Sequence, residues 1–214
     1  MKYNKKAIIF DLDGVICFTD KFHYQAWKTL ADRLGIYFDE KINDRLRGVS
    51  RMASLEIVLE RSDKQYSDSE KAAFAEEKNN TYRELLAKMT RADLPQEVWT
   101  TLHELRSRGY KLAIGSSSKN TKFILERIGL GDFFDAIADG TDITKSKPDP
   151  EVFLCAAKKL GIAPADCAVV EDAKAGIEAA KAGHMTAFAL FGDAKDCGLE
   201  DYALSSFGDL LNIL

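Results

Sequence analysis

The sequence lacks the features that would place it among secreted, membrane or disulfide-stabilised proteins. Its four cysteines, Cys17, Cys155, Cys167 and Cys197, form no CxxC pair and no zinc-ligand spacing, so we expect reduced thiols in a cytoplasmic protein. No segment approaches the roughly 18 apolar residues of a membrane span. The apolar run AIIF at 7–10 ends at an aspartate. It is too short for the apolar region of a signal peptide, which needs about seven residues or more.

An excess of charge of one sign is also missing. The formal net charge is −4, and no run of like charges is long enough for a binding tail. We therefore expect no general attraction to nucleic acid or to an anionic membrane. The 214 residues suffice for one good-sized domain, or for a core domain with a smaller insert. The expected partners are small molecules, and the expected state is a monomer.

Several common catalytic and binding motifs are absent. The chain has no GxGxxG, no Walker-type GK[ST], no HExxH and no GxSxG. A calcium-binding EF-hand loop starting at Asp11 fails, because its fifth position would be Val15 and Gly14 comes too early. These absences argue against dinucleotide, P-loop, zincin and α/β-hydrolase chemistry.

Short apolar runs alternate with helical patterns through most of the chain. AIIF (7–10), KLAIGS (111–116), CAVVE (167–171) and TAFAL (186–190) are nearly continuous apolar runs, which is typical of strands buried on both faces. Helices are predicted over 119–130, 151–161 and 173–183, with Ser118 as one N-cap and Gly161 and Gly183 as C-terminal signals. This alternation predicts an α/β fold with a Rossmann-like parallel sheet.

The segment 17–93 differs, because it shows only helical patterns and contains no proline. His23, Trp27, Leu30 and Leu34 fall on one stripe at helical spacing, and Ser67 with Glu70 fits a capping box. We therefore predict an α/β core domain from 1–16 and 94–214, with a helical domain inserted at 17–93. The hinges are expected near 16–20 and 91–96.

Polar side chains end or directly follow the predicted strands, and Lys147 lies in the loop after a further presumed strand, AIADG (136–140). These residues are Asp11, Asp13, Ser116, Ser117, Ser118, Lys147, Glu171 and Asp172. The carboxyl ends of parallel strands line one crevice, so we expect these side chains to converge. Carboxylate oxygens at that density suit Mg²⁺, whereas hydroxyls and a lysine suit phosphate. The pattern predicts phosphoryl transfer with a carboxylate nucleophile.

Each signal alone also has a plain structural interpretation. Asp11 to Gly14 could be an ordinary strand-to-turn junction, and Glu171 with Asp172 could be acids favoured at a helix start. His23 could be a packed histidine, and Arg51 or Lys78 could be solvated on a helix surface. The convergence of four separate segments is what favours the catalytic interpretation.

The four motifs, in their order along the chain, resemble the haloacid dehalogenase superfamily. They are FDLDGV (10–15), the serine run with Lys119, Lys147-Pro148, and Glu171-Asp172. The helical insert resembles the C1 cap of that superfamily. RGVSR (47–51) with Ser54, SSSKN (116–120), and His23 with Lys78 resemble its β-phosphoglucomutase subgroup.

The resemblance implies roles for individual residues. Asp11 would be the nucleophile and Asp13 the general acid/base, assisted by Ser116, Lys147, Thr19 and His23. Asp11, the backbone carbonyl of Asp13, Glu171 and Asp172 would hold Mg²⁺. The substrate-binding residues implied are Trp27, Gly48, Val49, Ser50, Arg51, Ser54, Lys78, Ser117, Ser118, Lys119 and Asn120. Of these, Arg51, Ser118, Lys119 and Asn120 would hold the phosphate that does not react.

The resemblance also implies an activity. A member of this subgroup interconverts β-D-glucose 1-phosphate and glucose 6-phosphate through an aspartyl-phosphate and glucose 1,6-bisphosphate. Two alternatives stay open: a sugar-phosphate phosphatase on the same scaffold, and a non-catalytic sugar-phosphate-binding protein. The chain departs from its relatives at Phe18, where many have an acid, and after Pro95, where a glycine is usual.

Overall fold

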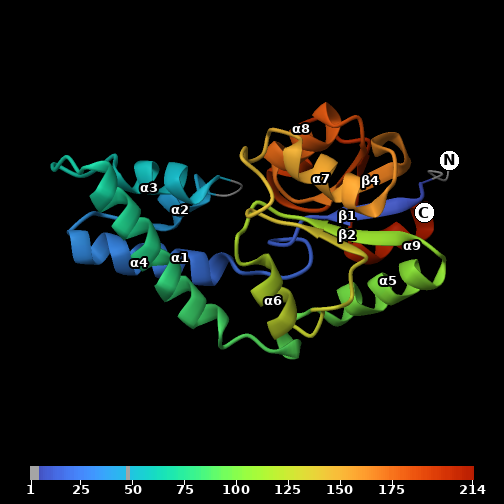
Figure 1. Cartoon of the computed structure of the whole chain (residues 1–214), viewed down its shortest axis with the longest axis horizontal. Coiled ribbons are helices and arrows are strands. Elements are labelled where there is room, and N and C mark those ends of the chain that lie inside the picture. Colours follow the sequence, from blue (N-terminus) through green and yellow to red (C-terminus); the bar gives the residue numbers. More distant parts are fainter. Residues whose placement is uncertain (1–4, 47–48) are drawn as a thin grey trace. The chain divides into compact units, whose positions relative to one another are not determined.

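The computed structural model describes residues 5–46 and 49–214, which form two compact units. Unit 1 is built from the segment ending at Phe18 and the segment from Thr90 to Leu214, and unit 2 from Thr19 to Met89. In Figure 1, unit 2 contains α1 to α4, and unit 1 contains the strands and the remaining helices. The assignment of these units to a catalytic core and a cap stays a prediction.

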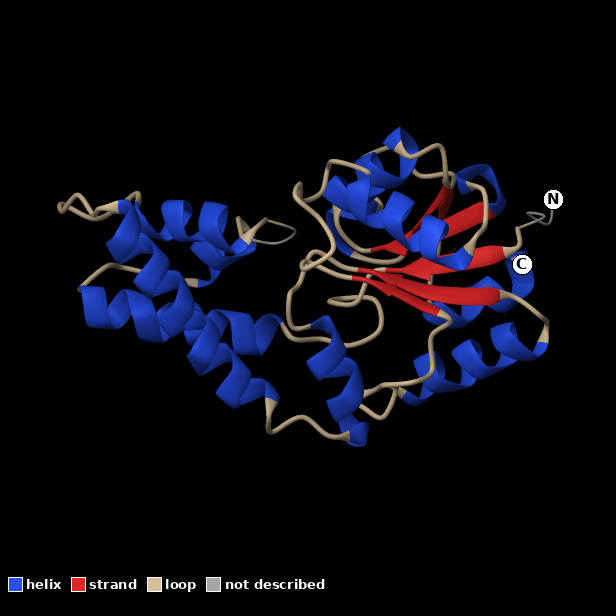
Figure 2. Ribbon diagram, in the orientation of Figure 1, coloured by secondary structure: helices blue, strands red, loops and turns tan. Residues whose placement is uncertain are grey.

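Unit 1 contains a parallel sheet of six strands within the described residues (Figure 2). The strands are β1 (Ala7–Phe10), β2 (Lys111–Gly115), β3 (Ala136–Ala138), β4 (Cys167–Glu171), β5 (Thr186–Ala189) and β6 (Tyr202–Ala203). Their order is β3-β2-β1-β4-β5-β6, and each neighbouring pair is parallel. The predicted α/β class is therefore confirmed. The exposed two-residue strand β6 has no apolar run and was not predicted.

Helices cover both faces of this sheet. They are α5 (Gln96–Ser107), α6 (Thr121–Arg127), α7 (Glu151–Leu160), α8 (Lys174–Ala182) and α9 (Leu210–Ile213). Short 3₁₀ turns lie at η1 (Arg91–Asp93), η2 (Pro164–Asp166), η3 (Gly192–Ala194) and η4 (Phe207–Asp209). Helices α7 and α8 lie on one face of the sheet, and α5 and α9 lie on the other (Figure 1).

The prediction of Ser118 as a helix N-cap is wrong. The N-cap of α6 is Asn120, which makes no side-chain cap hydrogen bond. The Ser118 hydroxyl instead accepts a hydrogen bond from the Asn120 backbone N–H at 3.2 Å. Such a local bond is a common alternative to helix for serine, so the chain makes a turn before α6 begins. Residues 116–120 are consequently a loop.

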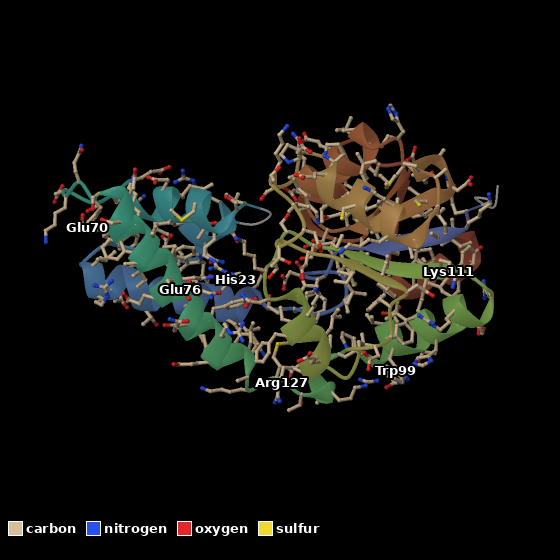
Figure 3. All side chains as sticks on the ribbon, viewed as in Figure 1. His23, Glu70, Glu76, Trp99, Lys111 and Arg127 are labelled. Atoms are coloured by element: carbon tan, nitrogen blue, oxygen red, sulfur yellow. The ribbon has the colours of Figure 1, made fainter. Side chains whose placement is uncertain are left out.

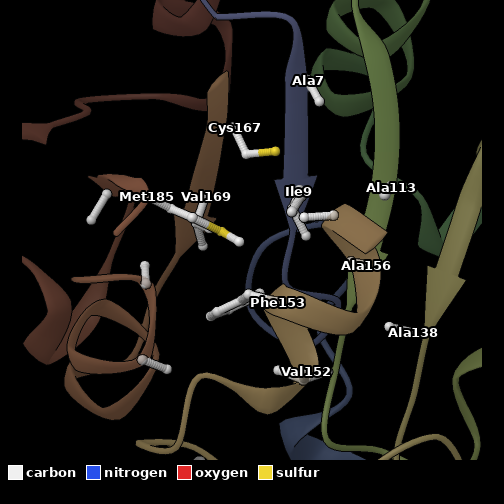
Figure 4. Packing of buried hydrophobic residues seen from close by; sticks show 14 of the residues in the cluster. Ala7, Ile9, Ala113, Ala138, Val152, Phe153, Ala156, Cys167, Val169 and Met185 are labelled. Carbon is white, nitrogen blue, oxygen red and sulfur yellow. The ribbon is translucent and has the colours of Figure 1, made fainter. Parts of the chain in front are cut away.

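The side chains of β1 alternate between two cores. Ala7 and Ile9 belong to a buried apolar cluster with Phe153 of α7 and Val169 of β4 (Figure 4). Phe10 points to the other face, where its ring stacks on Phe207 with centroids 5.6 Å apart. Since helices bury both faces, every residue of β1 is fully buried. This is why the strand appears in the sequence as an unbroken apolar run.

Unit 2 is helical in its described residues. Its helices are α1 (Asp20–Leu34), α2 (Glu40–Asp44), α3 (Arg51–Leu59) and α4 (Asp68–Leu86). Trp27 and Leu30 of α1 pack in one cluster with Leu55 of α3. The predicted capping box is confirmed, because the Ser67 backbone N–H donates to Glu70 Oε2 at 2.8 Å and the Ser67 hydroxyl caps α4. Each unit therefore has its own apolar core.

All four cysteines of the chain are free, with Cys17 and Cys167 buried. A helix long and apolar enough to span a bilayer does not occur in residues 5–46 and 49–214.

Candidate active site

The sheet brings the predicted site residues of unit 1 to one edge. Asp11 directly follows β1, Ser116 follows β2, and Asp172 follows β4. The Asp11 backbone N–H donates to the Val170 carbonyl of β4 at 3.0 Å, so the first and last of these segments lie side by side. Parallel strands place their carboxyl ends together, which is the usual position of ligand sites in such sheets.

Lys147 is the buried cation at this edge. Only 8% of the residue is exposed, and its Nζ donates to Asp11 Oδ1 and, at 2.6 Å, to Glu171 Oε1. Burial alone would lower the pKa of Lys147, but the charges of Asp11 and Glu171 outweigh burial and raise that pKa above its usual value. Lys147 therefore remains charged and ties the nucleophile candidate to the end of β4.

The carboxylates at this edge carry more negative charge than Lys147 balances. Burial, together with the charges of Glu171 and Asp13, raises the pKa of Asp11 to about 7 although Lys147 opposes the shift. Burial and the charges of Glu171 and Asp11 raise the pKa of Asp172 to about 9. Raised carboxyl pKa values mean that ionised forms are unfavourable without a further positive charge. A divalent cation would supply that charge.

The donor set fits a hard cation held by oxygen. Gly14 has a φ of +92°, and a Cβ there would lie 2.1 Å from Asp172 Oδ2, so the Asp172 carboxylate packs directly over the loop that carries Asp13. In the described part of the chain, no three acidic, histidine or cysteine side chains form a ready metal-binding group. The carboxylates of Asp11 and Glu171 instead both accept hydrogen bonds from Lys147.

Both carboxylate oxygens of Glu171 already have protein partners. Oε1 accepts from Lys147, and Oε2 accepts from the backbone N–H groups of Asp172 at 2.8 Å and Ala173 at 2.9 Å. Asp11, Asp172 and the Asp13 carbonyl are therefore the better candidates for direct metal ligands. Magnesium commonly uses few protein ligands and keeps several waters, so three donors suffice.

The serine loop provides a candidate phosphate site. Ser116 is buried, and its hydroxyl accepts from the Ser118 backbone N–H at 3.2 Å. The Ser117 hydroxyl is buried without a hydrogen-bond partner, which is costly unless a ligand completes it. The backbone N–H of Gly140 donates to the Ser118 carbonyl at 3.2 Å, which links this loop to the segment after β3. Lys119 is exposed and Asn120 is buried.

Unit 2 gathers a second set of predicted residues around His23 of α1 (Figure 3). Lys78 is 3% exposed, its Nζ lies 3.0 Å from His23 Nδ1, and it also lies 4.8 Å from the Trp27 ring. Burial, with the charges of Lys78 and Arg51, holds the pKa of His23 well below its usual value. Thr19 lies shortly before His23 in the sequence and is buried. Its hydroxyl accepts a hydrogen bond from the Tyr82 hydroxyl at 3.1 Å.

Arg51 opens α3 within unit 2. Its Nη2 donates to Asn79 Oδ1 at 2.8 Å, and Ser50 caps the helix by accepting from the Ala53 N–H at 3.3 Å. Ser54 is buried in the same helix, and Val49 is partly buried before it. Gly48, also predicted to bind substrate, lies outside the described residues. Sequence reasoning missed Asn79, whose only signal was its position next to Lys78.

Comparisons with known proteins agree on one family. Residues 5–184 match the family described as haloacid dehalogenase-like hydrolase. The chain is 44% identical over 184 residues to β-phosphoglucomutase of Bacillus subtilis (strain 168), covering 85% of this chain and 81% of that protein. It is 31% identical over 179 residues to a phosphorylated carbohydrates phosphatase of Thermotoga maritima, covering 82% and 80%.

A solved structure is also similar. The crystal structure of β-phosphoglucomutase from Clostridium difficile superposes with a TM-score of 0.89 at 39% sequence identity. The match covers 96% of this chain and 93% of that chain. The likeness therefore extends over the sheet and the helical insert alike.

Proposed function

This chain belongs to the haloacid dehalogenase-like hydrolase family, and from that membership we propose that it is a Mg²⁺-dependent phosphomutase. Its substrates would be β-D-glucose 1-phosphate and glucose 6-phosphate, interconverted through glucose 1,6-bisphosphate. The 44% identity to the Bacillus subtilis enzyme supports this choice of substrate. The structural observation that carries the proposal is the buried chain of ion pairs from Asp11 through Lys147 to Glu171.

Asp11 is proposed as the nucleophile. One of its carboxylate oxygens attacks a phosphorus of glucose 1,6-bisphosphate, the bond between phosphorus and the sugar oxygen breaks, and Asp13 gives a proton to the released oxygen, which leaves one glucose monophosphate. In the second half-reaction Asp13 takes a proton from the free hydroxyl of the other glucose monophosphate, and that oxygen attacks the phosphoryl group on Asp11. The bond between phosphorus and the Asp11 oxygen breaks, and glucose 1,6-bisphosphate forms again. Lys147 and the hydroxyls of Ser116 and Ser117 would stabilise the phosphoryl oxygens. Asp11, Asp172 and the Asp13 carbonyl would hold Mg²⁺, which would neutralise part of the negative charge at this site.

A mutase needs a second phosphate site, because the bisphosphate must bind in either direction. By family resemblance we assign the phosphate that does not react to Arg51 and to Ser118, Lys119 and Asn120. Arg51 offers a planar guanidinium suited to phosphate, and its bond to Asn79 keeps that group in place. His23, Trp27, Lys78 and Thr19 are proposed to contact the substrate or to support unit 2 around it.

A sugar-phosphate phosphatase is the second candidate function. It shares the first half-reaction, but water then attacks the phosphoryl group on Asp11. The 31% identity to the Thermotoga maritima phosphatase supports this alternative. A non-catalytic sugar-phosphate-binding protein is the third candidate, and the intact pair of carboxylates Asp11 and Asp13 argues against it, since a binder needs no nucleophile.

The test is a panel of hexose phosphates with Mg²⁺ and a trace of glucose 1,6-bisphosphate, in which both glucose 6-phosphate and free phosphate are measured. We expect β-D-glucose 1-phosphate to give glucose 6-phosphate with little free phosphate. Release of phosphate without glucose 6-phosphate would establish the phosphatase, and turnover of neither kind would favour the binder.

Asp11→Asn tests the nucleophile. It should lower turnover by about 10⁴-fold or more, because the amide cannot attack phosphorus, while the melting temperature stays close to that of the wild type. Lys147→Ala should also inactivate the enzyme. Lys145→Ala is its matched control, because Lys145 is an exposed lysine two residues away. Equal activity of the two lysine variants would contradict the role of Lys147.

A further inference from the structure

Glycine at position 176 makes room for the Glu171 carboxylate. Gly176 lies in the first turn of α8, and a Cβ there would be 1.9 Å from Glu171 Oε1 and 2.0 Å from its Cδ. No real Cβ tolerates such contacts. Its φ is not in the left-handed region, so backbone conformation does not require glycine. Glycine inside a helix costs about 1 kcal/mol relative to alanine, and the close approach of Glu171 is the structural reason to accept that cost.

A second glycine makes room on another side of Lys147. The Nζ of Lys147 lies 4.6 Å from the ring centroid of Phe153, which is a cation–π distance, and this ring is fully buried. Gly115, the last residue of β2, stands directly before Ser116, and a Cβ there would lie 2.6 Å from Phe153 Cδ1. Alanine at 115 would therefore push the ring away from its present place.

We propose that Gly115, Phe153, Glu171 and Gly176 form a Lys147 cradle that sets the position of the Lys147 ammonium beside Asp11. The inference rests on the proposed function, in which Lys147 stabilises the transferring phosphoryl group. Lysine has a flexible stem with about 2 kcal/mol of rotamer entropy, so a fixed ammonium needs contacts that hold it. Glu171 holds it by charge, Phe153 holds it by its ring face, and the two glycines allow both groups to come close.

The cradle assigns Glu171 a positioning role. Its Oε1 is occupied by Lys147, and its Oε2 is fixed by two backbone N–H groups. Gly176 acts through Glu171, and Gly115 acts through Phe153. None of these four residues needs to touch substrate, yet a displaced Lys147 would lose its charge-assisted bond to a phosphoryl oxygen.

The decisive variant is Gly176→Ala. We expect its affinity for orthovanadate with saturating Mg²⁺, measured by calorimetry, to fall about ten-fold or more, the value of one charge-assisted hydrogen bond. Gly183→Ala adds a methyl group at the other end of α8, where a Cβ would be 3.3 Å from the Ala179 carbonyl and 3.4 Å from Pro150. This control should keep its affinity within about two-fold, since such contacts are nearly ordinary.

Repeating the measurement of vanadate affinity in a Lys147→Ala background distinguishes an effect that acts through Lys147 from a general structural effect of the substitution. If Gly176 acts through Lys147, adding Gly176→Ala to that background leaves the vanadate affinity unchanged. Wild-type affinity in the single variant, or an equal loss in both backgrounds, overturns the cradle. If Gly176→Ala shows no thermal unfolding transition, Phe153→Leu replaces it, with an expected loss of about three-fold that disappears without Lys147. An equal loss in both backgrounds again overturns the proposal.

Kinetics distinguish this inference from the proposed function. In Gly176→Ala, kcat should fall while KM for the sugar phosphate changes little, because Lys147 acts on the reacting group. A wild-type protein that forms no glucose 6-phosphate would refute the mutase, whereas the vanadate measurements would still decide the cradle.

Discussion

Gly14 is needed both for its backbone conformation and for the space that it leaves to the Asp172 carboxylate. Its φ of +92° is costly for other amino acids, and a Cβ would strike the Asp172 carboxylate. Gly14→Ala should therefore lower the free energy of unfolding by about 1–3 kcal/mol and also weaken Mg²⁺-dependent turnover. Urea unfolding and an assay over a range of Mg²⁺ concentrations measure the two effects.

Gly161→Ala is the matched control for Gly14→Ala. Gly161 has a φ of +68°, and a Cβ there would meet nothing within 4 Å. It shares the backbone strain without the clash, so we expect a loss of about 1 kcal/mol in stability and unchanged turnover. Unchanged Mg²⁺ dependence in Gly14→Ala would show that Asp172 does not need its present position.

We expect His23 to give unit 2 a pH-dependent stability. An unfolded histidine titrates near 6.5, whereas burial, Lys78 and Arg51 keep the folded His23 neutral to lower pH. As the pH falls below about 6.5, the unfolded chain gains a proton that the folded chain does not gain, so the free energy of unfolding decreases. His23→Gln should flatten this dependence by up to about 1.4 kcal/mol per pH unit.

The measurement for His23→Gln is urea unfolding between pH 5 and pH 8. Above pH 7 His23 is neutral in both the folded and the unfolded wild-type chain. The wild type and His23→Gln should therefore show the same dependence of the free energy of unfolding on pH in that range. Parallel curves below pH 6 as well would mean that the folded histidine takes up its proton normally.

The polar residues of unit 1 could be placed from the sequence because each one follows a recognisable strand. Asp11, Lys147 and Glu171 do meet in one chain of ion pairs. The partners of each oxygen could not be predicted, because they depend on the tertiary path of the chain. Arg51 and Asn79, for example, are 28 residues apart and meet only because α3 packs on α4.

At the scale of elements, unbroken apolar runs located the central strands well. β1 and β4 have their predicted bounds, and β2 and β5 end one residue early. Helix starts were harder, since serines before α6 can either cap a helix or form a local turn. The sheet order could not be read from the runs, because each buried strand offers similar apolar faces to several neighbours.

The capping box of α4 makes a prediction for one element. Ser67→Ala removes the hydroxyl that caps the helix, so the free energy of unfolding should fall by about 1 kcal/mol. Glu84→Ala on the exposed part of the same helix is the control and should stay within about 0.5 kcal/mol of the wild type. Equal urea midpoints for Ser67→Ala and the wild type would contradict the cap.

At the scale of the whole molecule, each unit carries one of the two tryptophans. Trp27 lies in α1 of unit 2, and Trp99 lies in α5 of unit 1 (Figure 3). Since each unit has its own apolar core, we expect Trp27→Phe and Trp99→Phe to report different unfolding curves by fluorescence. Mg²⁺ with orthovanadate at about 100 times Kd should stabilise the Trp99 transition by about 2.7 kcal/mol.

The two fluorescence curves also test the independence of the units. A shift of the Trp99 curve with little change in the Trp27 curve is the expected result. Coincident curves that shift together would show that the chain unfolds as one cooperative body.

The central strand β1 is made first, but both of its partners come much later in the chain. It pairs with β2 at 111–115 and with β4 at 167–171, whereas unit 2 is one continuous segment. During synthesis on the ribosome, the helical unit can therefore complete its core while β1 still lacks neighbours. A nascent chain stalled before residue 167 would leave one edge of this apolar strand unpaired, so we expect the protein to need residues 167–214 to escape aggregation.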